Sequence, residues 1–265
     1  MEKNLSELLN RNPNVRFLLN TNQYKIRSDS RFLVPFMVYE HNEIRFGFVD
    51  RNENIVIPAI YDKVYDDFNS EKDLVRVGKR FVIDCGTKEK PRQYTYFKCG
   101  IINSNGEELI ACDKYESLYF ASVERLVAHG NRLIQSGCSL IDMQENVIVP
   151  YGVYDCIYHF SHGFARTRSH LSGGDVTWGV IDDEGNTIIP CGVFGYIWDM
   201  NPKYPHIVVR RDGKNYTLPI EILRKIQQEL KTTGSINTSV EEYLIYHQYL
   251  QRDFFRNEMI SLDEE

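Results

Sequence analysis

The chain has 265 residues, enough for one large or two small domains with a sizeable core. Its 42% hydrophobic and 26% charged residues are ordinary for a soluble globular protein, and its net charge of −6 lacks the basic excess that an obligatory nucleic-acid partner requires. No stretch approaches the ~18 apolar residues of a membrane span, and the N-terminus lacks the apolar core of a signal peptide. We therefore expect a cytoplasmic protein that has no membrane partner.

The first residues predict elements that lead into a repeat. Leu5, Leu8 and Leu9 give residues 1–20 a short helical pattern, which predicts an N-terminal cap. The run from Phe32 to Tyr39 is apolar and predicts a strand or strand pair that enters the first repeat.

The repeat begins with a glycine, two apolar residues and an acidic or amide residue. The copies are Gly47-Phe48-Val49-Asp50, Gly100-Ile101-Ile102-Asn103, Ser139-Leu140-Ile141-Asp142 and Gly179-Val180-Ile181-Asp182. Eight residues later three copies have Pro58, Pro150 or Pro190. An aromatic residue follows 11 or 12 positions after the motif, as Tyr61, Tyr115, Tyr154 or Phe194. Landmarks that recur at nearly constant offsets indicate one structural unit repeated four times.

Each unit is predicted to form a β-hairpin. The apolar pair is one strand, a turn follows in which Asn or Gly takes positive φ, and a β-branched triplet such as Ile55-Val56-Ile57 returns. The Asp or Asn that ends each motif is expected to satisfy backbone groups of the turn. A hairpin this short cannot bury its own apolar face, so we expect neighbouring units to stack into one array.

The repeat resembles the WG-repeat family. The resemblance rests on Trp178-Gly179-Val180-Ile181-Asp182 with Ile188-Ile189-Pro190, on the run from Phe160 to Arg166, and on Phe46-Gly47-Phe48-Val49-Asp50 with Tyr61-Asp62. Only the fourth copy has a literal Trp-Gly; the others have Phe46-Gly47, Cys99-Gly100 and Cys138-Ser139. The resemblance implies a bacterial, β-rich repeat protein that acts as an interaction module, and it implies no catalytic residue.

An insertion from Gly78 to Lys98 separates the first two copies. Phe81-Val82-Ile83 and the run from Tyr94 to Phe97 flank a polar loop and predict an extended hairpin. Insertions in repeat proteins often lie at a binding face, although a decorative loop is an equal alternative.

The C-terminal part predicts helices. One begins at Pro219 and continues to about Leu230, with Ile220, Leu223 and Ile226 on one face. A second begins at a capping box at Ser239. We expect these helices to cap the array, or alternatively to dock a partner through aromatic residues that include Tyr246 and Phe255. The expected organisation is mainly β: an N-terminal cap and four repeats over residues 1–216 (about 46–77, 99–129, 138–168 and 178–216), followed by a helical segment over residues 217–265.

Several polar residues form candidate sites. Arg76, Arg166 and Arg210 are assigned to one position of the strands that close the copies, where they form either an anion-binding ladder or a solvent-exposed row that pairs with acidic residues. Cys156, His159 and His162, with His170 nearby, have the spacing of a zinc site, but surface histidines are the favoured interpretation. The six cysteines contain no Cys-x-x-Cys pair, and we interpret them as buried free thiols.

No catalytic motif, cofactor site or metal site is predicted. The favoured hypothesis is a non-catalytic protein-interaction scaffold. The alternatives are a carbohydrate- or small-molecule-binding protein and an enzyme of unrecognised type. The candidate binding residues are Arg76, Arg166, Arg210, Trp178, Trp198, Tyr94, Tyr96, Tyr246 and Phe255.

Overall fold

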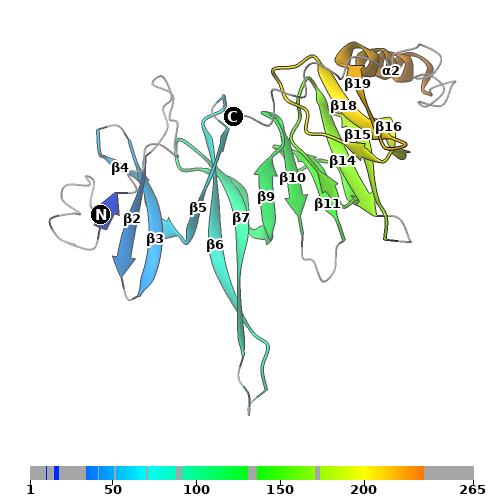
Figure 1. The fold of residues 1–265 in the computed structure, drawn as a ribbon. Helices are drawn as coiled ribbons and strands as arrows, with labels where there is room; N and C mark the ends of the chain where they lie inside the picture. Colours follow the sequence, from blue (N-terminus) through cyan, green and yellow to red (C-terminus); the bar gives the residue numbers. More distant parts are fainter. Residues whose placement is uncertain are drawn as a thin grey trace. The chain divides into compact units, whose positions relative to one another are not determined.

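Figure 1 shows the computed structural model of the chain as a ribbon. The structure describes residues 34–40, 42–50, 52–69, 71–87, 92–130, 136–170 and 174–235, together with residues 10, 15–17 and 90. Within these residues the regular elements are β-strands in five antiparallel sheets and one long helix near the C-terminus. The expected β-rich class is thus confirmed, whereas the helix predicted around Leu5, Leu8 and Leu9 lies outside the described residues.

The sheets follow one another along the chain, and the strands of each are consecutive in sequence. The first sheet contains β1 (Val15–Phe17), β2 (Val34–Glu40), β3 (Glu43–Val49) and β4 (Ile55–Tyr61). The second contains β5 (Lys63–Asn69), β6 (Leu74–Asp84), β7 (Gln93–Asn103) and β8 (Glu108–Tyr115). The third contains β9 (Ser117–Phe120), β10 (Arg125–His129), β11 (Cys138–Asp142) and β12 (Val147–Tyr154). The fourth contains β13 (Cys156–Ile157), β14 (Phe164–His170), β15 (Val176–Asp182) and β16 (Thr187–Phe194). The fifth contains β17 (Tyr196–Ile197), β18 (His206–Arg211) and β19 (Lys214–Pro219).

A copy of the sequence repeat spans two successive sheets. The chain leaves one sheet and enters the next at the residue after the landmark aromatic: Asp62, Glu116, Asp155 or Gly195. The backbone N–H of each of these residues donates to a carbonyl of the new sheet, on Gly78, His129, Arg168 and Arg210 respectively, at 2.9–3.0 Å. Each sheet therefore joins the end of one copy to the hairpin of the next.

The glycine that opens each copy is required by a close backbone approach. A Cβ at Gly47, Gly100 or Gly179 would lie 2.4–2.7 Å from the carbonyl oxygen of the returning strand. The hairpin register shifts at these positions. The third copy has Ser139 instead, and its Oγ donates to the carbonyl oxygen of Val149, 2.8 Å away. In the third copy a side-chain hydrogen bond to the returning strand thus stands where the other copies have glycine.

The turns confirm the role expected for the motif's last residue. In Asp142 the Oδ1 atom accepts the backbone N–H groups of Gln144 and Asn146 at 2.9 and 2.8 Å, and the other copies repeat this pattern. The expectation that Asn or Gly takes positive φ is correct for two copies, at Gly106 and Gly185, but in the other two the positive φ falls on Glu53 and Glu145.

The chain divides into two compact units, residues 1–134 with 141–146, and residues 135–140 with 147–265. In the first unit, a core cluster joins Phe48, Ile57 and Tyr61 of the first sheet to Val75, Val77, Ile102 and Cys112 of the second. In the second unit, the fourth and fifth sheets share a core with α2 (Ile220–Thr233). Consecutive sheets thus bury each other's apolar faces within a unit, as short hairpins require.

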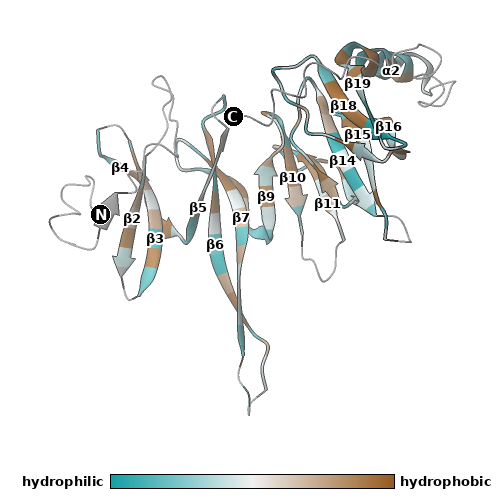
Figure 2. Cartoon of the chain, in the orientation of Figure 1, coloured by the Kyte–Doolittle hydropathy of each residue, from teal (hydrophilic) through white to brown (hydrophobic). Residues whose placement is uncertain are grey.

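Helix α2 covers part of the last sheets, as predicted for a cap. It begins after Pro219 and ends at Gly234, whose φ of 73° closes the helix through a hydrogen bond to Leu230. Ile220, Leu223 and Ile226 are buried, and the opposite face of the helix is polar. Helix α2 is therefore partly brown (hydrophobic) and partly teal (hydrophilic) in Figure 2. No described helix is long and apolar enough to cross a membrane.

Candidate interaction site

The insertion between the first two copies forms the extended hairpin that its sequence predicts. Strands β6 and β7 stay in register from Leu74–Asn103 to Asp84–Gln93, and their distal halves project beyond the neighbouring strands β5 and β8 (Figure 1). The backbone N–H of Cys85 continues the ladder with a bond to the Arg92 carbonyl at 2.9 Å. The distal half is thus a regular two-stranded ribbon.

One face of this ribbon is apolar and exposed. Phe81 pairs with Tyr96 and Ile83 pairs with Tyr94, and paired residues and residues two apart share a face. We name these four residues the aromatic face. The rings of Phe81 and Tyr96 stack with centroids 5.7 Å apart, and those of Tyr94 and Tyr96 are 6.1 Å apart. Ile83 is 49% exposed and Tyr94 is 62% exposed.

Ionic contacts fix the base of the hairpin to its surroundings. The Lys79 Nζ atom lies 2.6 Å from Glu108 Oε1, which also accepts from the Tyr61 hydroxyl at 3.0 Å. Burial and the nearby Glu108 carboxylate raise the pKa of Tyr61, which therefore remains a donor. Arg80 pairs with Glu43, and hydrogen bonds from Arg45 and Arg80 lower the pKa of that carboxyl. The ribbon therefore projects from a well-anchored base.

The predicted binding residues Tyr94 and Tyr96 thus lie together on the hairpin. Tyr246 and Phe255, proposed from the C-terminal pattern, lie outside the described residues. Trp178 and the three arginines lie in strands of the sheets, and Trp198 directly follows β17.

Arg76 and Arg166 are engaged within the fold rather than extended into solvent. Arg166 is 6% exposed, donates from Nη1 to the Ile197 carbonyl at 2.8 Å, and pairs with Asp199 at 2.5 Å. Arg76 donates in the same way to the carbonyl of Leu118. Leu118 and Ile197 hold the same place in their copies, three residues after the landmark aromatic. The two arginines therefore make one repeated contact between successive sheets.

The assignment of Arg210 to the position of Arg76 and Arg166 is wrong. Tyr158 N–H donates to the Arg166 carbonyl, and the equivalent Trp198 N–H donates to that of Val208. Arg210 instead corresponds to Arg168. The carbonyl of Arg168 accepts the backbone N–H of Asp155, and the carbonyl of Arg210 accepts that of Gly195, the equivalent residue between two sheets. Arg210 is exposed on β18, so the three side chains do not form one ladder.

The tertiary structure brings Trp178 and Trp198 into one aromatic cluster. The Tyr196 ring lies 4.7 Å from both tryptophan rings, and Tyr158 stacks on Trp178 at 5.9 Å. The Arg166 guanidinium lies 4.1 Å from the Tyr158 ring centre and 4.7 Å from that of Trp178. Because Trp178 is only 7% exposed, this cluster mainly packs the fourth and fifth sheets together.

Sequence reasoning missed a signal for this cluster. The residue four positions after the landmark aromatic is aromatic in every copy: Tyr65, Tyr119, Tyr158 and Trp198. In two copies the arginine of the closing strand lies over this ring. The Arg76 guanidinium is 3.9 Å from the Tyr65 ring centre, and the Arg166 guanidinium lies over the Tyr158 ring. The aromatic residue at this fixed offset, followed in two copies by an arginine in the closing strand, was the available clue.

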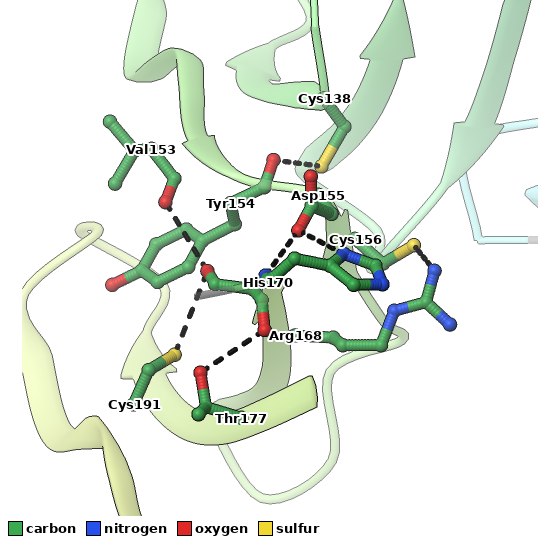
Figure 3. A network of polar contacts seen from close by, with 10 residues as sticks. Cys138, Val153, Tyr154, Asp155, Cys156, Arg168, His170, Thr177 and Cys191 are labelled. Atoms are coloured by element: carbon green, nitrogen blue, oxygen red, sulfur yellow. Dashed lines mark hydrogen bonds and ion pairs between the residues drawn. The ribbon is translucent and has the colours of Figure 1, made fainter. Parts of the chain in front are cut away.

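Two members of the cysteine and histidine group, Cys156 and His170, make polar contacts within the protein (Figure 3). His170 Nδ1 lies 2.7 Å from Asp155 Oδ2, and Cys156 Sγ accepts from Arg168 Nη2 at 3.0 Å. In the described part of the chain no group of three or more His, Cys, Asp or Glu residues is placed to hold a metal ion.

All six cysteines are free thiols, but the expectation that they are buried holds only in part. Cys99, Cys112 and Cys138 are buried, Cys156 and Cys191 are half-buried, and Cys85 is exposed on the hairpin.

Comparison with known proteins agrees with the repeat geometry. A family model described as a WG containing repeat matches residues 46–80, 139–169 and 178–214, which hold the first, third and fourth copies. No curated protein matches the chain. The matched segments include the Gly or Ser close approach, the Asp turn and the closing strand described above. These three segments of the chain are therefore WG repeats.

Proposed function

We propose that this chain is a non-catalytic protein-interaction module in which the WG repeats hold the β6–β7 hairpin out as the contact element. The observation that supports this most directly is the aromatic face. Exposed apolar side chains that gather on one surface are typical of binding sites. Here they lie on a ribbon whose base is fixed by Lys79–Glu108 and Arg80–Glu43, so little ordering is needed on binding.

A carbohydrate-binding role for Trp178 and Trp198 has less support. Sugar-binding tryptophans need an open ring face, but the Trp178 ring packs against Tyr158, Tyr196 and Arg166. Tyr94, in contrast, is the most exposed of the large hydrophobic residues in the described part of the chain, at 62%.

The test compares two faces of one hairpin. The variant Ile83→Ser/Tyr94→Ser removes the two most exposed side chains of the aromatic face, and Val82→Ser is the matched control because Val82 is 51% exposed on the opposite face. Tagged full-length chains are used to recover partners from native lysate, and binding is then measured with the purified partner. We expect wild type and Val82→Ser to retain one stoichiometric protein that the double variant loses. Equal recovery by all three chains, or recovery of nothing by wild type, contradicts the proposal.

A further inference from the structure

The hairpin differs in charge from the rest of the chain. Residues 79–98 contain six basic and two acidic residues, a balance of +4. The other residues contain 25 basic and 35 acidic residues, a balance of −10. The exposed aromatic face is therefore carried by a basic segment of the chain.

The cations divide into an anchored set and an exposed set. At the base, Lys79 and Arg80 bind carboxylates, and Lys98 donates to the Asp113 carbonyl with its Nζ 5.2 Å from the Phe81 ring centre. At the distal end, Lys90 and Arg92 are exposed, and their backbones are held by bonds to Thr87 and Cys85. These two cations are available to a ligand lying on the aromatic face.

The acidic residue that the structure describes in this hairpin, Asp84, points away from the aromatic face. Asp84 pairs with Gln93, and both alternate with Ile83 and Tyr94 along the ribbon, so that they lie on the Val82 face. The aromatic face is thus apolar in its middle, with Lys98, whose Nζ donates to a neutral carbonyl, at its base and with Lys90 and Arg92 at its distal end. A complementary ligand has apolar side chains and negative charge on either side of them.

We propose that the aromatic face binds an acidic protein segment that carries apolar side chains. The inference rests on the proposed function, and it adds the chemistry of the partner. A second copy of the chain is disfavoured because face-to-face pairing brings two +4 hairpins together. A nucleic acid is disfavoured because the remaining balance of −10 repels a long polyanion.

The test uses defined probes and the full-length chain. The first probe is a fluorescent peptide of about 12 residues in which Glu alternates with Leu and Phe. The second is the same peptide with each Glu replaced by Lys, and the third is a single-stranded oligothymidine of about equal length. Fluorescence anisotropy gives each Kd at about 50 and about 300 mM NaCl. We expect the acidic peptide to bind about tenfold more tightly than the other probes and to weaken several-fold as salt rises.

Two charge variants distinguish the effect of the hairpin cations on peptide binding from the effect of the net charge of the whole chain. Lys90→Glu/Arg92→Glu is expected to weaken binding of the acidic peptide about tenfold. Lys203→Glu/Lys214→Glu changes the net charge equally at exposed positions of the second unit and is expected to leave the Kd within about twofold.

The outcomes distinguish the inference from the proposed function. If Ile83→Ser/Tyr94→Ser abolishes peptide binding but Lys90→Glu/Arg92→Glu does not weaken it, the acidic preference is wrong and the interaction face stands. If the oligothymidine or the Lys peptide binds as tightly, or if sedimentation shows a dimer that Ile83→Ser/Tyr94→Ser dissociates, the inference is overturned. If neither peptide binds, it is overturned as well, and the partner recovery above still decides the proposed function.

Discussion

The Nη1 atom of Arg166 donates a hydrogen bond to the carbonyl oxygen of Ile197, 2.8 Å away. This bond joins β14 of the fourth sheet to β17 of the fifth. Arg76 makes the equivalent bond to Leu118, from β6 of the second sheet to β9 of the third. A guanidinium that binds a backbone carbonyl and lies over an aromatic ring is thus a recurring contact between successive sheets of this protein.

We expect Arg166→Ala to lower the free energy of unfolding by about 3 kcal/mol, because it leaves the Ile197 carbonyl without its donor and removes packing between Tyr158 and Trp178. Arg210→Ala is the control, since Arg210 is exposed, and it is expected to change the stability by less than about 0.5 kcal/mol. Urea unfolding measures both values. Equal losses would contradict the repeated-contact interpretation.

The turn of the third copy is expected to tolerate an exchange of its charged and amide residues. Asn146 Nδ2 donates to Asp142 Oδ2 at 2.8 Å, and the second copy reverses the pair, with Asn103 Nδ2 donating to Glu107 Oε2 at 2.6 Å. Asp142→Asn should therefore lower the thermal midpoint, and Asp142→Asn/Asn146→Glu should recover most of the loss. A double variant no more stable than the single one would show that the amide–carboxylate bond contributes little.

The same turns predict that the protein loses stability in acid. Hydrogen bonds from Asn146 and Asn54 lower the pKa of Asp142 and Asp50 below the ordinary Asp value. A carboxyl with a lowered pKa stabilises the fold above its unfolded pKa, about 3.9, and this contribution disappears as the pH falls through the folded pKa. The urea midpoint should therefore fall between about pH 4 and about pH 2. The fall should be shallower in Asp142→Asn, and an identical slope would contradict the assignment.

The cysteines should differ sharply in reactivity towards a thiol reagent. Burial raises the pKa of Cys112 and of Cys138 to about 12, so neither forms thiolate near neutral pH. Cys85 is exposed on the hairpin. We expect one fast-reacting thiol in the native protein, lost in Cys85→Ser, and reaction of all the others after unfolding. A fast phase that survives in Cys85→Ser would show that a second thiol is accessible.

Helix α2 is expected to contribute to the stability of the last sheets. Leu223 is fully buried against the core of the fourth and fifth sheets, and Leu223→Ala should cost about 3 kcal/mol. Arg224, its exposed neighbour on the helix, provides the control, and Arg224→Ala should change stability by less than about 0.5 kcal/mol. Similar unfolding midpoints for the two variants would show that the helix does not cap the core.

The local features of this protein follow from its amino-acid sequence. Gly47 and its counterparts, the Asp turns and the runs on either side of the insertion depend on contacts between residues close in the chain, which a sequence pattern records directly. The hairpin that carries Tyr94 and Tyr96 was therefore predictable.

Which side chains act together depends on contacts between residues far apart in the chain. The register of β6 against β7 places Ile83 beside Tyr94 and Val82 on the opposite face, and a shift of one residue would exchange them. The packing of one sheet on the next decides which carbonyl Arg166 reaches, and it joins Trp178 to Trp198 through Tyr196. Arg210 could not be separated from Arg166 by sequence, because both lie in short apolar strands and differ only in the backbone bonds that define their registers.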